Sequence, residues 1–194
     1  MSTPTLVLGS TSRYRAELLR RLWPDFEQRA PGTDESPLPG ETPRERALRL
    51  AVAKARAVAA ELEDALVIGS DQVAELEGLV LDKPGTAERA RAQLAACSGR
   101  EVHFHTALCV HDTRSGEDLA HVDHTRVYFR DLDDGEIARY VERERPLDCA
   151  GSFKCEGLGI SLFERIDNQD PSALVGLPLI ALARLLREAG LRLP

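Results

Sequence analysis

Two hydrophobic patterns divide most of this chain of 194 residues into short strands and longer helices. Apolar runs at 6–8 and 65–68 predict short buried strands, because a strand covered on both faces is apolar at successive positions. Between them, 43–62 has apolar residues every three to four positions, which predicts an amphipathic helix that begins with Pro43 after Thr42 as its cap. Further helices are predicted at about 13–23, 86–97, 133–142 and 178–189.

The second half of the chain adds strands that pair as a hairpin. Residues 101–110 alternate between polar and apolar side chains, and 119–129 returns as their partner after a turn, so a long hairpin is expected. A shorter hairpin-like piece at 73–81 turns at Glu77-Gly78, and 158–166 is expected to form the last strand. Strands and helices alternate around the long inserted hairpin, which predicts an α/β fold with a mixed, twisted sheet flanked by helices.

The composition is that of an ordinary soluble globular protein, with 43% apolar and 29% charged residues. No internal repeat, low-complexity tract or linker interrupts the pattern, so residues 1–194 are expected to form a single domain. No apolar run approaches the roughly 20 residues that cross a membrane, and the first four residues lack the pattern of a secretory signal. Four cysteines without a C-x-x-C pair indicate free thiols, and a cytoplasmic protein is expected.

The charges restrict the class of ligand. The formal net charge of −7 argues against a surface that wraps polymeric nucleic acid, but a local cluster of cations could still hold a small anionic substrate. The 25 Lys+Arg residues comprise 22 arginines and only three lysines, Lys54, Lys83 and Lys154. In so arginine-rich a chain, a lysine is expected where a compact, mobile ammonium is needed, as at a phosphate group. The alternative is that three unimportant lysines persist by chance.

Small polar residues follow both of the short buried strands, as Gly9-Ser10-Thr11-Ser12 and Gly69-Ser70-Asp71-Gln72. In open α/β sheets ligands bind beyond the carboxyl ends of strands, so both segments are candidate parts of a site. The first segment also opens a helix, where hydroxyl groups and free N–H groups can hold a phosphate. Arg13 and Arg15, one turn further on, could reach back toward the same anion. A plain capped helix is the alternative interpretation.

Asp71 is the sharper candidate, because an unpaired carboxylate directly after an apolar strand is costly to desolvate. A divalent metal or a catalytic water would explain it, and hydrogen bonds to nearby backbone N–H groups are the alternative. Glu35, which follows Asp34 in a loop rich in proline and glycine, could supply a second carboxylate, since magnesium is held by hard oxygen ligands and phosphate. The alternative is a solvated acidic loop. His103 and His105 form an H-x-H pair that is more typical of a strand face than of a metal site.

Short motifs spread along the chain carry a resemblance to a known family. In chain order they are Leu8-Gly9-Ser10-Thr11-Ser12-Arg13-Tyr14-Arg15, Asp34-Glu35, Lys54-Ala55, Ser70-Asp71-Gln72-Val73, Lys83-Pro84, Ser98-Gly99-Arg100, Ala150-Gly151 and Val175-Gly176-Leu177-Pro178-Leu179. Their identity and order resemble the Maf family of nucleoside triphosphate pyrophosphatases, which have also been described as septum-formation inhibitors. The resemblance extends over about residues 5–190. It implies a Maf/ITPase-like fold, a homodimer, and a divalent metal, Mg²⁺ or Mn²⁺, as cofactor.

The resemblance also implies roles for individual residues. Asp71 matches the aspartate that accepts a proton in the family. Glu35 matches a metal-associated glutamate, and Asp71 is expected to share that metal. The family's phosphate-binding residues correspond to Ser10, Arg15, Lys54 and Lys83. The family usually has proline where this chain has Arg13, which leaves the conformation of that turn uncertain but keeps the hydroxyls and Arg15.

Three positions resemble the subgroup of the family that acts on 7-methyl-GTP, namely Tyr14, Gln72 and Glu156. Members that act on thymidine and uridine triphosphates instead have arginine, threonine and glutamine there. Physical chemistry agrees, because N7-methylguanine carries a delocalised positive charge that an aromatic ring can stack on. A carboxylate at its edge supplies the opposite charge and accepts N–H bonds. The subgroup more often has tryptophan at position 14. Tyrosine stacks less strongly, so a weaker preference for the methylated base is predicted.

The sequence therefore predicts an enzyme that hydrolyses the α–β phosphate bond of 7-methyl-GTP to 7-methyl-GMP and pyrophosphate, and so clears modified nucleotides. Its partner is a small nucleotide, with neither polymeric nucleic acid nor a membrane involved. Lys154 would reach phosphate or brace Glu156. Two alternatives remain at this point: the same chemistry on another triphosphate, such as dTTP, UTP or a purine, or a septum-formation inhibitor that binds nucleotide without turnover.

Overall fold

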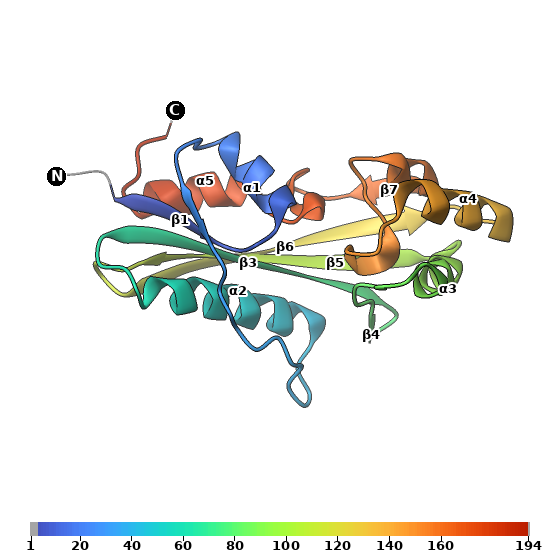
Figure 1. Ribbon diagram of the computed structural model, residues 1–194, viewed down its shortest axis with the longest axis horizontal. Helices are drawn as coiled ribbons and strands as arrows, with labels where there is room; N and C mark the ends of the chain where they lie inside the picture. The colour runs from blue at the N-terminus through green and yellow to red at the C-terminus, as the bar shows by residue number, and fades with distance from the viewer. Residues whose placement is uncertain (1–3, 194) are drawn as a thin grey trace. The chain divides into compact units, whose positions relative to one another are not determined.

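Strands and helices alternate along the part of the chain that the computed structural model describes, residues 4–193 (Figure 1). The strands and α-helices in that part are, in chain order, β1 (Thr5–Gly9), α1 (Arg13–Arg20), β2 (Glu27–Arg29), α2 (Pro43–Ala59), β3 (Ala65–Leu76), β4 (Leu79–Val80), α3 (Ala87–Cys97), β5 (Glu101–Asp112), β6 (Glu117–Phe129), α4 (Asp134–Glu144), β7 (Phe163–Asp167) and α5 (Leu179–Glu188). Short 3₁₀ helices add η1 (Ala150–Ser152), η2 (Leu158–Leu162) and η3 (Ala173–Val175).

The strands form one mixed sheet in the order β2-β1-β3-β5-β6-β7, with β4 paired to β3. β1 runs parallel to both β2 and β3, whereas β4 is antiparallel to β3 and β7 is antiparallel to β6. β5 and β6 are the two arms of the long hairpin. The predicted α/β class with a mixed sheet and an inserted hairpin is confirmed.

The described residues divide into two compact units, and β3, β5 and β6 each pass from one into the other. Unit 1 comprises the chain up to Asp71, Thr106–Asp123 and the chain from Asp170 onward. Unit 2 comprises Gln72–His105 and His124–Gln169. The single domain over residues 1–194 stays a prediction.

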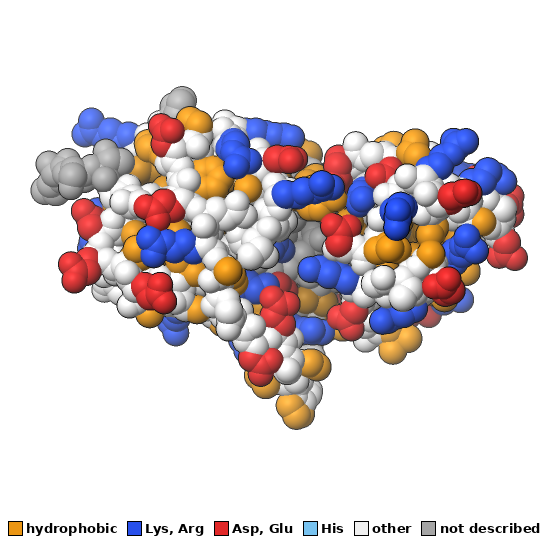
Figure 2. Space-filling model, in the orientation of Figure 1, with side chains coloured by type: hydrophobic (Ala, Val, Ile, Leu, Met, Phe, Trp, Pro, Cys, Tyr) orange, Lys and Arg blue, Asp and Glu red, His pale blue; other side chains and the backbone are white. Residues whose placement is uncertain are grey.

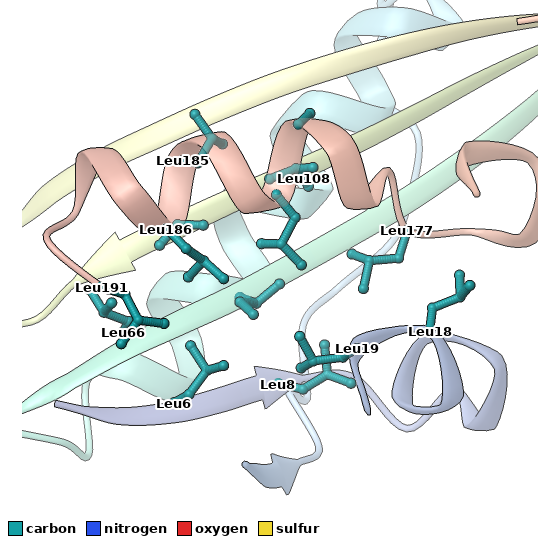
Figure 3. Packing of buried hydrophobic residues seen from close by; sticks show 14 of the residues in the cluster. Leu6, Leu8, Leu18, Leu19, Leu66, Leu108, Leu177, Leu185, Leu186 and Leu191 are labelled. Carbon is teal, nitrogen blue, oxygen red and sulfur yellow. The ribbon is translucent and has the colours of Figure 1, made fainter. Parts of the chain in front are cut away.

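Helices cover both faces of the sheet in unit 1, which explains the continuous apolar runs of its strands. Leu6 and Leu8 of β1 point to the face covered by α1 and α5, where they join a leucine-rich core (Figure 3). Val7 between them points to the opposite face and packs against Val58 of α2. Successive strand residues point to opposite faces, so three adjacent apolar residues serve two cores. In Figure 1, α2 lies on the other side of the strands from α1 and α5.

At Gly69 of β3, the backbone of α2 lies close to the sheet. A Cβ atom at this position would lie 2.1 Å from the carbonyl oxygen of Ala51 and 2.6 Å from the amide nitrogen of Ala55. Because both contacts are backbone atoms of a packed helix, neither can move aside cheaply. The lack of a side chain at Gly69 therefore allows α2 to approach the strand that carries Asp71.

We expect Gly69→Ala to destabilise the protein by about 3 kcal/mol, because the added methyl overpacks this contact. The midpoint of thermal unfolding should fall by roughly 6–12 °C. Gly40→Ala is the comparison variant. A Cβ there has no heavy atom within 4 Å, so its cost is that of a left-handed backbone at φ 76°, about 1–2 kcal/mol, and it should lower the melting temperature less than Gly69→Ala. Equal melting temperatures for wild type and Gly69→Ala would contradict this close approach.

Two predictions about local structure are wrong, and one strand is absent from the predictions. β3 continues to Leu76 and does not end at 68, so residues 69–72 lie inside a strand. The segment 158–166 is first a 3₁₀ helix and becomes the strand β7 only at Phe163. β2 was missed because Glu27-Gln28-Arg29 is wholly polar, as suits an edge strand open to solvent. The hairpin turn at Glu77-Gly78 is confirmed, with φ angles of 51° and 85°.

On the face drawn in Figure 2, acidic and basic side chains are intermingled, and neither sign forms a continuous stripe. No helix within residues 4–193 is long and apolar enough to cross a membrane. All four cysteines are free, as predicted, and burial raises the pKa of the Cys97 thiol to about 12.

Candidate active site

The turn between β1 and α1 is held by its own hydroxyl groups. Ser12 caps α1, as its Oγ accepts a hydrogen bond from the backbone N–H of Arg15 at 3.4 Å. The backbone N–H of Ser12 in turn donates to Oγ of Ser10 at 3.2 Å, and Gln28 of β2 donates to the Ser10 carbonyl at 2.7 Å. Ser10 is buried. The predicted phosphate-binding turn is thus a preformed loop at the start of a helix.

Arg15 projects from the first turn of α1 into the same site. Its Nη1 lies 3.4 Å from Oγ of Ser10, and its Nε donates to the carbonyl of Gly176 at 2.9 Å. Burial lowers the pKa of the Arg15 guanidinium, while the negative charges of Asp71 and Glu35 oppose that shift. A guanidinium fixed through Nε still presents its terminal nitrogens to a ligand, which suits phosphate recognition.

Lys54, Glu35 and Asp71 meet in unit 1 although they lie on three different segments. Nζ of Lys54, on α2, lies 2.7 Å from Oδ1 of Asp71 on β3 and 2.6 Å from Oε1 of Glu35. Lys54 and Asp71 are only 5% and 7% exposed. The structure therefore pairs the buried Asp71 with a lysine ammonium, and it brings Glu35, from a loop without regular structure, to the same point.

Two arginines of α2 hold the loop that carries Glu35. Arg46 donates to the Glu35 carbonyl at 3.2 Å, and Arg49 donates to the Ser36 carbonyl at 3.1 Å. Asp34 accepts hydrogen bonds from both the N–H and the hydroxyl of Ser36, which lower the pKa of the Asp34 carboxyl. Asp34 thus shapes the loop, and Glu35 is the carboxylate that reaches Lys54.

The guanidinium of Arg13 lies against the Tyr14 ring, and its reach back to the anion site stays a prediction. Its Nη2 donates to the Tyr14 hydroxyl at 2.9 Å, and its guanidinium carbon lies 4.8 Å from the centre of the Tyr14 ring. This is a cation–π contact between neighbours in the sequence. One face of the predicted base-stacking ring is therefore covered by an arginine, in the position where the family usually has proline.

Unit 2 holds Lys83, Gln72 and Glu156, and their roles stay predictions. Lys83 is exposed in the segment that follows β4, and Gln72 is partly buried and follows Asp71 directly on β3. Glu156 is exposed, and its Oε2 accepts a hydrogen bond from the Cys155 thiol at 3.4 Å.

The segment that presents Glu156 is anchored by the two residues Phe153 and Lys154, just before it in the sequence. Phe153 packs edge-on against three other phenylalanines, with ring centres between 4.7 and 5.7 Å apart. Lys154 donates from Nζ to the carbonyl of Glu144 at 3.1 Å, near the end of α4, and from its backbone N–H to the Tyr140 hydroxyl at 3.0 Å. Lys154 therefore fastens this segment to α4, and a contact of Lys154 with phosphate or with Glu156 stays a prediction.

The carboxylates of unit 1 have the donor chemistry of a magnesium site. Among the residues that the structure describes, no group of three or more histidine, cysteine, aspartate or glutamate side chains could hold a metal ion. Glu35 and Asp71 are only two, but Mg²⁺ is usually held by one or two carboxylates together with phosphate oxygens of the substrate.

The H-x-H pair, His103 and His105, contacts a neighbouring strand, since Nδ1 of His103 lies 2.9 Å from Nε2 of His124.

Known proteins resemble this chain over nearly its whole length. The sequence model of the family described as Maf-like protein matches residues 5–189. The chain belongs to the Maf family. A 7-methyl-GTP pyrophosphatase of Burkholderia thailandensis is 58% identical over 192 residues, which cover 97% of this chain and 89% of that protein. One of Xanthomonas oryzae pv. oryzae is 58% identical over 191 residues, covering 98% of this chain and 100% of that protein.

A solved structure shares the fold of this Maf family member. The Ham1 protein of Staphylococcus aureus superposes with a TM-score of 0.54 over 95% of this chain and 99% of its own, at 18% sequence identity. At that identity the likeness concerns the fold alone. The predicted Maf/ITPase-like architecture is confirmed by the family match and this likeness together.

Residues that support the site in this Maf protein were not singled out from the sequence. Oγ of Ser70, fully buried, lies 2.8 Å from the Ala107 carbonyl and 3.0 Å from the Gly176 carbonyl, the same oxygen that binds Arg15. Asp170 accepts hydrogen bonds from the N–H groups of Ser172 and Ile180, which places the segment containing Gly176 at the start of α5. Ser70 and Gly176 lie inside family motifs, and this was the only sequence feature from which their supporting role could have been predicted.

Proposed function

We propose that this chain is a nucleoside triphosphate pyrophosphatase that hydrolyses 7-methyl-GTP to 7-methyl-GMP and pyrophosphate. The observation that carries the proposal is the buried Asp71, 2.7 Å from Nζ of Lys54, in the unit where Ser10 and Arg15 form a cation-lined turn. A carboxylate repels an anionic ligand, so a site that only bound phosphate would not be expected to contain one. Its presence among phosphate-binding cations therefore supports a role in the chemistry. The names of the 58% identical relatives support the choice of substrate.

In the proposed reaction Asp71 orients the attacking water and takes its proton. The water oxygen bonds to the α-phosphorus, and the bond from that phosphorus to the bridging oxygen breaks, so that pyrophosphate leaves. Ser10, Arg15, Lys54 and Lys83 hold the triphosphate in line, since phosphoryl transfer depends mainly on positioning and electrostatics. Mg²⁺ or Mn²⁺, held by Glu35 and Asp71, would neutralise charge on the phosphate oxygens. The homodimer is proposed on the family resemblance, and the cytoplasmic location on the free cysteines.

Roles at the base are proposed for Tyr14, Glu156 and Gln72, each carried over separately from the family resemblance. The Tyr14 ring has one face under Arg13, so the cationic base would stack on the other face or take the place of the guanidinium. The exposed carboxylate of Glu156 would supply the charge opposite to that of the methylated base. Both interactions favour 7-methylguanine over guanine because only the methylated base is positively charged.

Pyrophosphate release from a panel of nucleotides tests the substrate. We expect wild type to prefer 7-methyl-GTP to GTP, and Glu156→Gln to reduce that ratio of kcat/KM about tenfold, since about 1.4 kcal/mol of differential interaction corresponds to a factor of ten. Glu164→Gln, which removes an exposed carboxylate of β7 in the same unit, should leave the ratio unchanged.

Two outcomes would contradict the proposal in different ways. Preferred turnover of dTTP or UTP would keep the pyrophosphatase chemistry and overturn the substrate. Binding of nucleotides without pyrophosphate release from any of them, in the presence of Mg²⁺ or Mn²⁺, would overturn the enzyme and favour a nucleotide-binding septum-formation inhibitor.

A further inference from the structure

Lys54 lies between the two carboxylates that are proposed to hold the metal. Its Nζ is 2.6 Å from Oε1 of Glu35 and 2.7 Å from Oδ1 of Asp71, so both oxygens converge on one ammonium. The Lys54 side chain is 7% exposed and that of Asp71 is 11% exposed, which limits the compensation that water can provide. One positive charge thus offsets the negative charges of both candidate ligands.

A divalent cation that bound both oxygens would have to share them with Nζ. Metal–oxygen distances for Mg²⁺ are about 2.0–2.1 Å, so an ion bound to Oε1 and Oδ1 would lie beside an ammonium that donates to the same two atoms. The two cations would also repel each other strongly at such short range in a partly buried site. Lys54 and the metal therefore compete for Glu35 and Asp71.

We propose that Lys54 is a built-in counter-ion that holds the cation position between Glu35 and Asp71 until a triphosphate arrives. The inference rests on the proposed function, because it takes these carboxylates as metal ligands and the triphosphate as substrate. The phosphate oxygens offer the ammonium another anionic partner, and when Lys54 turns to them the two carboxylates are left to a divalent cation. Nucleotide and metal then bind cooperatively, each raising the affinity for the other by the same factor.

The choice of lysine at position 54 agrees with this exchange. In a chain with 22 arginines, an arginine here would be the ordinary cation, but its planar fork tends to bind a carboxylate in a fixed bidentate geometry. Lysine is a point charge on a flexible stem with three rotatable donors, so it can change partners with little rearrangement of the backbone. Arg15 keeps its bond to the Gly176 carbonyl and supplies the fixed charge of the site.

Binding of Mn²⁺ alone, measured in the full chain by the paramagnetic resonance signal of the free ion, tests the proposal without any turnover. Without nucleotide, we expect Lys54→Met to bind Mn²⁺ at least tenfold more tightly than wild type. Lys54→Met combined with Glu35→Gln should lose the gain. Arg184→Met, which removes an exposed positive charge from α5 in the same unit, is the control for net charge and should match wild type.

A Mn²⁺ affinity of Lys54→Met equal to or weaker than that of wild type would overturn the proposal. Lys54→Gln, which can still donate a hydrogen bond to a carboxylate, serves as a second variant if the methionine variant does not fold, and the same tightening is expected. The assay does not depend on the base or on catalysis. A failure of pyrophosphate release would therefore contradict the proposed function, but it would not contradict tighter Mn²⁺ binding by Lys54→Met.

Discussion

Replacing Asp71 by asparagine is expected to lower the turnover of 7-methyl-GTP by about 10²- to 10⁴-fold, the range in which a positioned general base contributes. Asparagine has the same shape, and its Oδ1 can still accept the hydrogen bond that Lys54 Nζ makes at 2.7 Å. It cannot take a proton from water. The loss should therefore appear in kcat at saturating nucleotide, measured as initial rates of pyrophosphate release.

Folding has to be followed beside the rates, because Asp71 is buried and ion-paired. Asp25→Asn, an exposed aspartate in the same unit, is the matched control and should keep both the rate and the melting temperature of wild type. If Asp71→Asn melts like wild type and turns over nucleotide at a near-normal rate, Asp71 is not the base.

Replacing Arg15 by lysine is expected to lower kcat/KM by about 10²- to 10³-fold, the usual effect of removing one preorganised donor to developing charge. Lysine keeps the positive charge but lacks the nitrogen that corresponds to Nε, which binds the Gly176 carbonyl at 2.9 Å. A lysine at this position cannot be fixed by Gly176 and present two further nitrogens to phosphate at the same time.

The distribution of the loss between kcat and KM distinguishes the role of Arg15. An interaction made only in the transition state lowers kcat and kcat/KM equally, whereas uniform binding raises KM alone. Arg21→Lys, at the exposed end of α1, is the control and should leave both constants unchanged. An Arg15→Lys enzyme with wild-type kcat/KM would show that charge alone is needed there.

Most local features of the fold could be predicted because neighbouring residues decide them. Ser12 and Thr42 cap α1 and α2 as expected, since a cap depends on a side chain and an N–H group only two or three residues apart. The turn at Glu77-Gly78 likewise depends on which residues tolerate a positive φ. The errors arose where distant partners overrule the local signal. Gly69-Ser70-Asp71-Gln72 resembles a turn, yet β3 continues through it because strand pairing and the contact of Gly69 with α2 favour an extended backbone.

The sequence by itself determined the family, the alternation of strands and helices, and the identity of the charged groups, because these reside in residue types, spacing and ordered motifs. The tertiary structure alone decided that Glu35, Lys54 and Asp71 share one ion-paired point. It also decided that Ser70 and Arg15 meet at the Gly176 carbonyl, and that Lys154 binds the end of α4. The physical reason is that a side chain's partners are chosen by which backbones pack together, and that depends on the whole chain.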